Sequence, residues 1–360
     1  AHNFNVTPTV AGRVIYLTQA GYAVGLFFMV PLGDLLERKK QILITTILAM
    51  LSLLLAATAS SFLVLEIASF CIGFSSIVPQ LILPLAAHLA EPAKRGKIIG
   101  GIMSGLLLGI LLSRTLSGGI GAWLGWRSMY WIAVGICFIL FLLMLIRFPQ
   151  SKPHFKGTYR QLMRSLATLL PYHTLQEACL TNALAFANFG AFWTTMVLLL
   201  ASRPFYFNSG QIGLFGLVGA GGALAASFVG RMGDKRSPRI TIGYGLFILL
   251  ASFVVLYLSR NSVWGIIAGT VLLDLALQAV HVSNQTRIYA LIPEARNRLN
   301  TIYMTVSFIG TASGSAFGLW LWDKGEWPAV CIGCASITTL AIVVYSLYHR
   351  KLSGAGQPIS

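Results

Sequence analysis

The stretch GDLLERKK, residues 33–40, places an acidic residue before a basic cluster at the end of a long apolar run. A second stretch, GDKRSPR at residues 233–239, starts with the same Gly-Asp pair at an offset of about 200 residues. Further along each half, PAKRGK (92–97) matches PEARNR (293–298) in Pro, Arg and a final basic residue. These pairs predict two halves of related fold, divided by the basic segment from about 148 to 177.

The chain of 360 residues is strongly apolar. Hydrophobic residues make up 56% of it and charged residues only 10%, whereas a soluble domain carries about 25% charged residues. Apolar runs of about 20 residues, long enough to cross a bilayer, recur along the whole length. We therefore predict an all-α membrane protein with eleven transmembrane helices. The predicted spans are about 13–33, 41–60, 62–89, 98–121, 127–147, 178–201, 211–230, 240–259, 262–290, 299–322 and 327–348.

The net charge of +16 follows the loops between these spans. Alternate loops are rich in Lys and Arg, and the loops between them hold only single basic residues. By the positive-inside rule the basic loops are cytoplasmic, and so is the C-terminus. The basicity thus indicates the topology of a membrane protein, and it does not predict binding to nucleic acid. The basic loops lie at residues 38–40, 94–97, 147–164, 231–239, 287–298 and 350–351.

The topology of the first span predicts a further helix. Because the loop at 33–40 is cytoplasmic, the span before it starts on the outer face, with AHNFNVTPTVAG outside. This stretch has no charged n-region or apolar h-region of a signal peptide. We expect one more transmembrane helix ahead of Ala1 in the natural protein, which brings the expected count to twelve.

Four regions follow from the repeat and the spans. We expect an N-terminal half at 1–148, a cytoplasmic linker at 149–176, a C-terminal half at 177–350 and a tail at 351–360. The linker carries apolar residues near helical spacing with basic residues between them, which indicates an amphipathic helix on the cytoplasmic leaflet. A flexible linker is the alternative.

GDLLERKK resembles the signature loop of the major facilitator superfamily, and the resemblance extends over the whole chain. Glu37 departs from it, because the family has glycine at this place. In that family the acidic residue, here Asp34, interacts with a helix N-terminus of the opposite half and stabilises one transport state. The resemblance implies the same for Asp234. The expected gate-loop residues are Asp34, Arg38, Asp234, Arg95 and Arg296.

The stretch LGWRSMYWI, at 124–132, resembles bacterial efflux permeases of this superfamily, and the resemblance implies a bacterial inner membrane. Two patterns of the drug-antiporter branch are missing. The span 62–89 contains no arginine, and Arg114-Thr115 stands where the Gly-Pro pair of the family's fifth helix aligns. These departures argue against standard drug–proton exchange. Glycines at every fourth position in the same helix, Gly101, Gly105 and Gly109, are typical of close helix packing.

The stretch LLDLALQAVHVSNQTRIY, at 272–289, carries a polar stripe on an apolar helix. Asp274, Gln278, His281 and Gln285 are spaced i, i+4, i+7 and i+11, so they share one face. In the superfamily that the chain resembles, this stretch corresponds to helix ten. That helix lines a central cavity together with helices one, four and seven. The corresponding stripes of helices four and seven are Glu66, Ser69, Gly73, Ser76 and Gln80, and Glu177, Thr181, Asn188 and Thr195.

Two interpretations of these stripes stay open, namely a substrate or ion pathway and hydrogen bonding between helices. Charged groups in mid-bilayer cost about 2.5–3.5 kcal/mol on insertion scales, so Asp274 and Arg114 are the foremost pathway candidates. Glu66 and Glu177 lie near span ends, where interfacial solvation could suffice. His281 fits proton handling or a structural hydrogen bond. The candidate pathway residues are Asp274, Gln278, His281, Gln285, Arg114, Glu66, Gln80 and Asn188.

These features predict a secondary transporter that works by alternating access and exports a small organic solute or drug in exchange for protons. Uptake of a sugar or organic anion is the alternative within transport, and a membrane receptor or scaffold is the alternative outside it. No nucleotide-binding loop and no catalytic constellation appears in the sequence, so we expect neither an enzyme nor a cofactor. The five cysteines all fall within spans, which favours packing over a metal site. We expect a functional monomer whose partners are the bilayer, the solute and protons.

Overall fold

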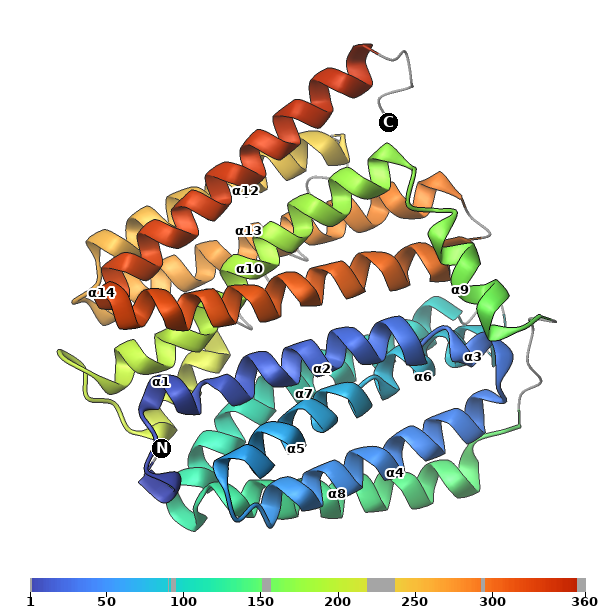
Figure 1. The fold of residues 1–360 in the computed structure, drawn as a ribbon, viewed down its shortest axis with the longest axis horizontal. Coiled ribbons are helices and arrows are strands. Elements are labelled where there is room, and N and C mark those ends of the chain that lie inside the picture. Colours follow the sequence, from blue (N-terminus) through green and yellow to red (C-terminus); the bar gives the residue numbers. More distant parts are fainter. Residues whose placement is uncertain are drawn as a thin grey trace. The chain divides into compact units, whose positions relative to one another are not determined.

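The computed structural model describes residues 2–89, 91, 95–150, 157–218, 237–292 and 295–354, and all regular secondary structure in these ranges is helical (Figure 1). For some of these residues, including Arg95 and Arg114, only the backbone is described. The helices are η1 (His2–Phe4), α1 (Pro8–Ala11), α2 (Arg13–Met29), α3 (Leu32–Leu35), α4 (Arg38–Ala57), α5 (Phe62–Ser75), α6 (Val78–Leu89), α7 (Arg95–Leu124), α8 (Trp126–Arg147), α9 (Tyr159–Ala167), α10 (His173–Ala201), α12 (Pro238–Leu258), α13 (Val263–Leu291) and α14 (Arg296–Gly354).

Within the described ranges, eight stretches are long and apolar enough to cross a membrane. The last of them, Arg296–Tyr348, contains two helices, because the backbone of Gly325 and Glu326 is not helical. The predicted span 98–121 lies within α7, and most of the predicted span 211–230 lies outside the described residues. The all-helical membrane fold is therefore confirmed, and the count of eleven stays a prediction.

The predicted span 62–89 is broken near its middle. Helix α5 ends at Ser75 and α6 begins at Val78, with Pro79 in the first turn of α6. Proline fits this position because its missing N–H would have no partner in a first turn. The sequence thus sets the place of the break.

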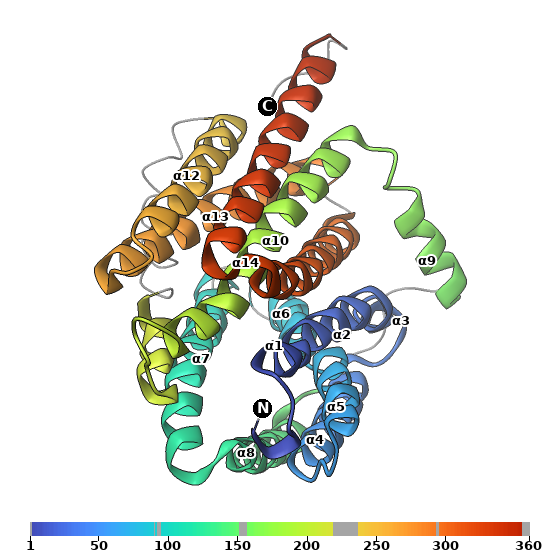
Figure 2. The ribbon, with the colours of Figure 1, turned by 60° about the vertical axis from the view of Figure 1, so that its left-hand side comes forward.

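The chain forms two compact units. Unit 1 comprises residues 1–5, 17–165 and 208–217, and unit 2 comprises residues 6–16, 166–207 and 218–360. In unit 1, α4 packs against both α5 and α8. In unit 2, α10 packs against α14 and α13, and α12 packs against α13 and α14 (Figures 1 and 2).

Small residues allow the close contact between α10 and α14 in unit 2. A Cβ atom on Gly314 would collide with the backbone oxygen of Ala187, and one on Gly310 would collide with that of Ala183. Glycine at these positions therefore sets how closely the two backbones approach. By contrast, among the described residues a Cβ atom on Gly101, Gly105 or Gly109 of α7 would meet nothing within 4 Å. The packing role expected of those three glycines stays a prediction.

The linker between the halves contains α9. Its residues Leu162 and Leu166, and Leu169 just beyond it, are buried in the protein at 2–5% exposure. The apolar side of this segment is thus covered by protein, whereas the sequence had indicated contact with the lipid leaflet. The basic residues Arg160 and Arg164 lie on its exposed side.

Candidate solute and proton site

Helix α13 carries the predicted polar stripe. It begins after Ser262, whose hydroxyl accepts a hydrogen bond from the N–H of Gly265, and it continues through a run of Leu, Ala and Val. Asp274 is buried at 5% exposure. The next stripe residues, Gln278 and His281, are half-buried. This part of the stripe therefore reaches the margin of unit 2 and does not lie wholly within its core.

His281 belongs to a cluster built from three helices, which we call the histidine cluster and which consists of Asn182, His281, Tyr303 and Ser307. Nδ2 of Asn182, on α10, lies 3.3 Å from Nδ1 of His281 and 2.6 Å from Oγ of Ser307. The hydroxyl of Tyr303, on α14, lies 3.2 Å from the same Nδ1 and donates to the backbone oxygen of His281 at 2.9 Å. The other three residues are buried, and only His281 is half-buried.

Aromatic rings surround this cluster. The ring of Tyr303 stacks on that of His281 at a centroid distance of 5.4 Å, and Phe186 lies 5.2 Å from it. Phe186, Phe189 and Trp193 follow one another on α10, with centroids about 6 Å apart, and all three are half-buried. Their spacing of i, i+3 and i+7 places them on one helix face. The sequence analysis missed this aromatic face, although its spacing was a visible signal.

The aromatic face and the polar stripe meet at Asp274. Nε1 of Trp193 donates to Oδ1 of Asp274 at 3.5 Å. One region of unit 2 thus brings together a buried carboxylate, a half-buried imidazole and aromatic rings from α10. Such a mixture, with apolar surface and a few placed polar groups, is typical of sites that bind small organic molecules.

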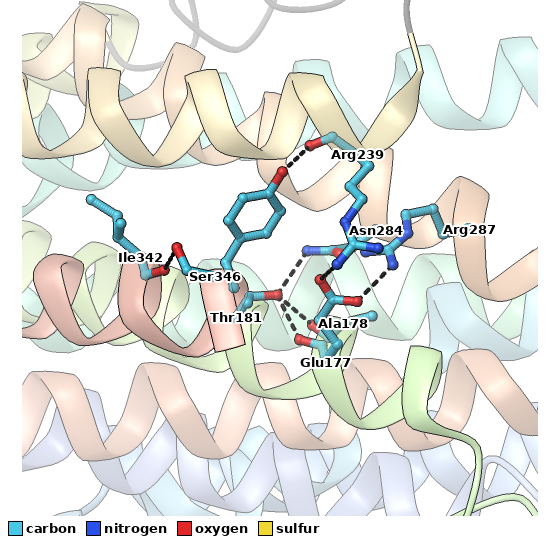
Figure 3. Close-up of polar contacts among 9 residues, drawn as sticks. Glu177, Ala178, Thr181, Arg239, Asn284, Arg287, Ile342 and Ser346 are labelled. Atoms are coloured by element: carbon cyan, nitrogen blue, oxygen red, sulfur yellow. Dashed lines mark hydrogen bonds and ion pairs between the residues drawn. The ribbon is translucent and has the colours of Figure 1, made fainter. Parts of the chain in front are cut away.

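A second polar cluster lies near the histidine cluster, and we call its three residues, Glu177, Arg239 and Arg287, the arginine cluster (Figure 3). Oε2 of Glu177, on α10, lies 2.7 Å from Nη2 of Arg287 on α13, and Oε1 lies 3.3 Å from Nη2 of Arg239 on α12. Exposure is 0% for Glu177, 4% for Arg239 and 8% for Arg287. One carboxylate therefore serves two buried guanidinium groups, and the cluster keeps one surplus positive charge.

Neighbouring contacts hold the arginine cluster in place. The hydroxyl of Tyr345, on α14, donates to the backbone oxygen of Arg239 at 3.0 Å, and the Arg239 guanidinium lies 5.8 Å from the Tyr345 ring centroid. Nδ2 of Asn284 donates to Thr181 Oγ1 at 3.2 Å, and this hydroxyl in turn donates to the backbone oxygen of Glu177 (Figure 3). Interfacial solvation, which the position of Glu177 near a span end had left open, does not apply to it, because the residue is fully buried among helices.

The remaining pathway candidates lie elsewhere. Asn188 is fully buried and donates to Thr338 Oγ1 at 2.9 Å, so it holds α10 against α14. Gln285 donates to Tyr289 and Asn300 at 3.0 and 3.1 Å. In unit 1, Gln80 donates to the hydroxyl of Tyr22 at 3.4 Å.

Unit 1 also carries Glu66, which is half-buried on α5. The side chain of Arg114 lies outside the described part of the structure, so its role in the pathway stays a prediction.

The predicted gate residues are only partly described. Nη2 of Arg38 lies 3.4 Å from Oδ1 of Asp34, and Arg38 Nε also donates to the backbone oxygen of Gly33. Nε of Arg296 donates to the backbone oxygen of Tyr289 at 3.1 Å. Asp234 and the side chain of Arg95 lie outside the described residues.

Comparison with known proteins shows the family. The family model described as Major Facilitator Superfamily matches residues 1–175 and 178–358. The chain belongs to this superfamily. A relative in Escherichia coli, the putative uncharacterized transporter YgaY, is 42% identical over 353 residues, which cover 98% of this chain and 90% of YgaY.

Two further matches agree with membership of the Major Facilitator Superfamily. A probable sugar efflux transporter of Helicobacter pylori is 25% identical over 328 residues, covering 88% of this chain and 80% of that protein. The crystal structure of the human organic anion transporter MFSD10 has the same fold, with a TM-score of 0.69 at 18% identity over 94% of this chain and 83% of its own. This superfamily member is thus a multi-pass membrane protein and a transporter, and it is not an enzyme.

Proposed function

We propose that this protein is a secondary transporter that works by alternating access and exports a small polar organic solute in exchange for protons. The observation that carries the proposal is the meeting of buried Asp274 with a half-buried aromatic and polar face in unit 2. A carboxylate in mid-membrane is costly, and such residues usually mark a substrate or ion pathway. We propose that the carboxyl group of Asp274 carries the proton that is exchanged for the solute.

A sugar or similar polyol is the solute class that this face suits best. The rings of Phe186, Phe189 and Trp193 offer flat apolar surface to C–H groups, and Gln278 and His281 offer hydrogen bonds to hydroxyl groups. The printed name of the Helicobacter pylori relative, a probable sugar efflux transporter, supports the same class.

The topology completes the proposal. The basic loops place the C-terminus in the cytoplasm of a bacterial inner membrane. We assign residues 1–148 and 177–350 to the two halves and propose that a monomer provides a complete pathway between them. The gate function assigned to Asp34, Arg38, Asp234, Arg95 and Arg296 belongs to this proposal.

The test uses the full-length protein in vesicles with an imposed pH gradient and a panel of radiolabelled mono- and disaccharides. We expect uphill saccharide movement against the direction of proton flow. In Asp274→Asn we expect uphill movement to disappear while downhill exchange continues, since the substitution removes the exchangeable proton. The control is Asp323→Asn, which removes an exposed carboxylate that accepts a hydrogen bond from Thr9 at 2.8 Å. Full pH-driven accumulation by Asp274→Asn would contradict the assignment.

A further inference from the structure

The arginine cluster holds two guanidinium groups and one carboxylate. Both oxygens of Glu177 are in use, because Oε1 contacts Arg239 at 3.3 Å and Oε2 contacts Arg287 at 2.7 Å. The side chains are enclosed, with 0% exposure for Glu177 and 5% and 6% for the two arginines. A buried charge is costly unless it is paired. Among the described residues, the cluster is therefore one negative charge short of neutrality.

Each arginine of the cluster also has an N–H group without an acceptor. Nε of Arg239 and Nη1 of Arg287 are buried, and neither has a hydrogen-bond partner in the described part of the chain. In each guanidinium group this nitrogen shares its carbon atom with the Nη2 that contacts Glu177, so it lies beside that contact (Figure 3). A guanidinium fork can bind an anion with two parallel N–H groups. Here one carboxylate is divided between two forks, and each fork is only half used.

The cluster lies near the ends of its three helices. Glu177 is the fifth residue of α10, Arg239 is the second of α12, and Arg287 is the fifth from the end of α13. At 1.5 Å per residue each of them is within about 8 Å of a helix end. An ion from the aqueous phase therefore needs to pass only a short layer of protein to reach the two arginines.

We propose that the arginine cluster is a binding site for one small inorganic anion, of which chloride is the simplest. The anion accepts hydrogen bonds from Nε of Arg239 and Nη1 of Arg287 and brings the cluster to neutrality. The enclosure of the side chains favours a small ion over an organic acid or a lipid headgroup. Because the arginines belong to α12 and α13 and their shared carboxylate to α10, the bound anion helps to hold these three helices together. The proposal is independent of Asp274 and of the transported solute.

A water molecule is the competing occupant. The amide oxygen of Asn284 is buried and, among the described residues, without a donor, and Nδ2 of the same side chain donates to Thr181 Oγ1 at 3.2 Å. A water can donate to this oxygen and accept from a guanidinium group, as buried waters do. Water carries no charge, however, and leaves the positive charge of the cluster in place. Binding of an anion and binding of water therefore differ in how stability responds to the salt that is present.

The first experiment measures anion binding directly. Purified full-length protein in detergent is equilibrated with ³⁶Cl⁻ at constant ionic strength, with gluconate as the replacing anion. We expect saturable binding of about one chloride per chain, displaced by bromide. Arg287→Met leaves Glu177 paired with Arg239 alone, so saturable binding should disappear. Arg127→Met is the matched control, since it removes an arginine that donates to the backbone oxygen of Ala59 at 2.8 Å, and it should bind chloride as before.

The second experiment follows thermal unfolding at the same ionic strength. Chloride that binds only the folded protein should raise the melting temperature, by about 3 °C or more at one hundred times its dissociation constant. Glu177→Gln gives the cluster two positive charges, so its melting temperature should rise more steeply with chloride. In Arg287→Met the response should be lost. Opposite responses in these two variants would follow from charge, and loss of packing alone would not produce them.

The unchanged protein provides a test even if the variants do not fold. Absence of saturable ³⁶Cl⁻ binding, together with equal melting in chloride and gluconate, would overturn the proposal and leave water as the occupant. Chloride binding that persists in Arg287→Met would place the anion at another site and would also overturn it. Failure of saccharide transport has no bearing on these measurements, so the two proposals can be judged separately.

Discussion

The arginine cluster and the histidine cluster use the same two helices in opposite ways. Both draw on α10 and α13, and they lie about one and a half turns apart on each helix, at Glu177 and Asn182 on α10 and at Arg287 and His281 on α13. The arginine cluster holds three charges that are all buried. The histidine cluster contains one half-buried side chain, that of His281, and its other three residues are buried. Charge alone therefore does not mark the solute site.

The two clusters differ in which groups remain unneutralised or partly exposed once their internal contacts are made. In the arginine cluster both oxygens of Glu177 are used by guanidinium groups, and the surplus is a buried positive charge. Buried ion pairs of this kind tie elements together, and removing one partner is costly. In the histidine cluster the part left over is the half-buried ring of His281. We infer that the arginine cluster fixes α10, α12 and α13, whereas the histidine cluster belongs to the face that we propose for the solute.

The largest expected effect comes from Glu177→Gln. Among the described residues it leaves two buried guanidinium groups without a counterion, and breaking a buried pair in this way costs about 3–5 kcal/mol. We expect a strong loss of thermal stability and of folded yield in detergent. Glu37→Gln is the control, since it breaks a 3.3 Å pair with Lys40, which is 75% exposed. An unchanged melting temperature in Glu177→Gln would show that the arginine cluster does not stabilise the helix contacts.

A smaller effect is expected for Arg287→Met. The substitution removes the 2.7 Å bond to Glu177 but leaves Arg239 as a counterion, so no charge is left unpaired. The loss should be about 1.5–3 kcal/mol, the value of a hydrogen bond to a charged group. Parallel melting curves of Arg287→Met and Glu177→Gln measure the asymmetry. A greater loss in Arg287→Met would contradict the surplus of positive charge.

The third prediction separates structure from recognition on one helix. Asn182→Ala and Asn188→Ala each remove a buried amide from α10, and each should cost about 1 kcal/mol. Only Asn182→Ala should also lower saccharide transport, because Asn188 contacts Thr338 and not His281. Transport assays at matched amounts of folded protein measure the difference. Equal transport in the two variants would remove Asn182 from the recognition site.

The sequence predicted the membrane fold because the apolar spans and the basic loops are local signals. It also predicted the stripe of α13, since helical periodicity places Asp274, Gln278 and His281 on one face. It could not predict which helices would face this stripe. The contacts of Glu177 join residues that are 62 and 110 positions apart, and no periodicity encodes such pairs.

Charge counting misled the sequence analysis at two residues. Arg239 and Arg287 were counted among the basic residues of the cytoplasmic loops, but both are buried beside Glu177. The positive-inside rule counts charges near span ends and does not distinguish a solvated arginine from a paired one. Asn182 was missed because it follows Thr181 directly and falls beside the stripe and not on it.

The smallest expected effect concerns Asp34, whose carboxylate is 30% exposed and pairs with Arg38 at 3.4 Å in the same loop. As a half-buried i,i+4 pair it contributes little more than the about 0.3–0.5 kcal/mol of an exposed helix pair, so Asp34→Asn and Arg38→Gln should melt almost as the unchanged protein does. A gate role adds a second expectation. If Asp34 also stabilises a helix N-terminus in one transport state, its loss removes up to about 1 kcal/mol from that state alone, which shifts the populations about fivefold. Arg38→Gln leaves the carboxylate in place and should shift them less. Distances between spin labels on the two halves report these populations, and identical distributions in Asp34→Asn and the unchanged protein would reduce Asp34 to a member of a local ion pair.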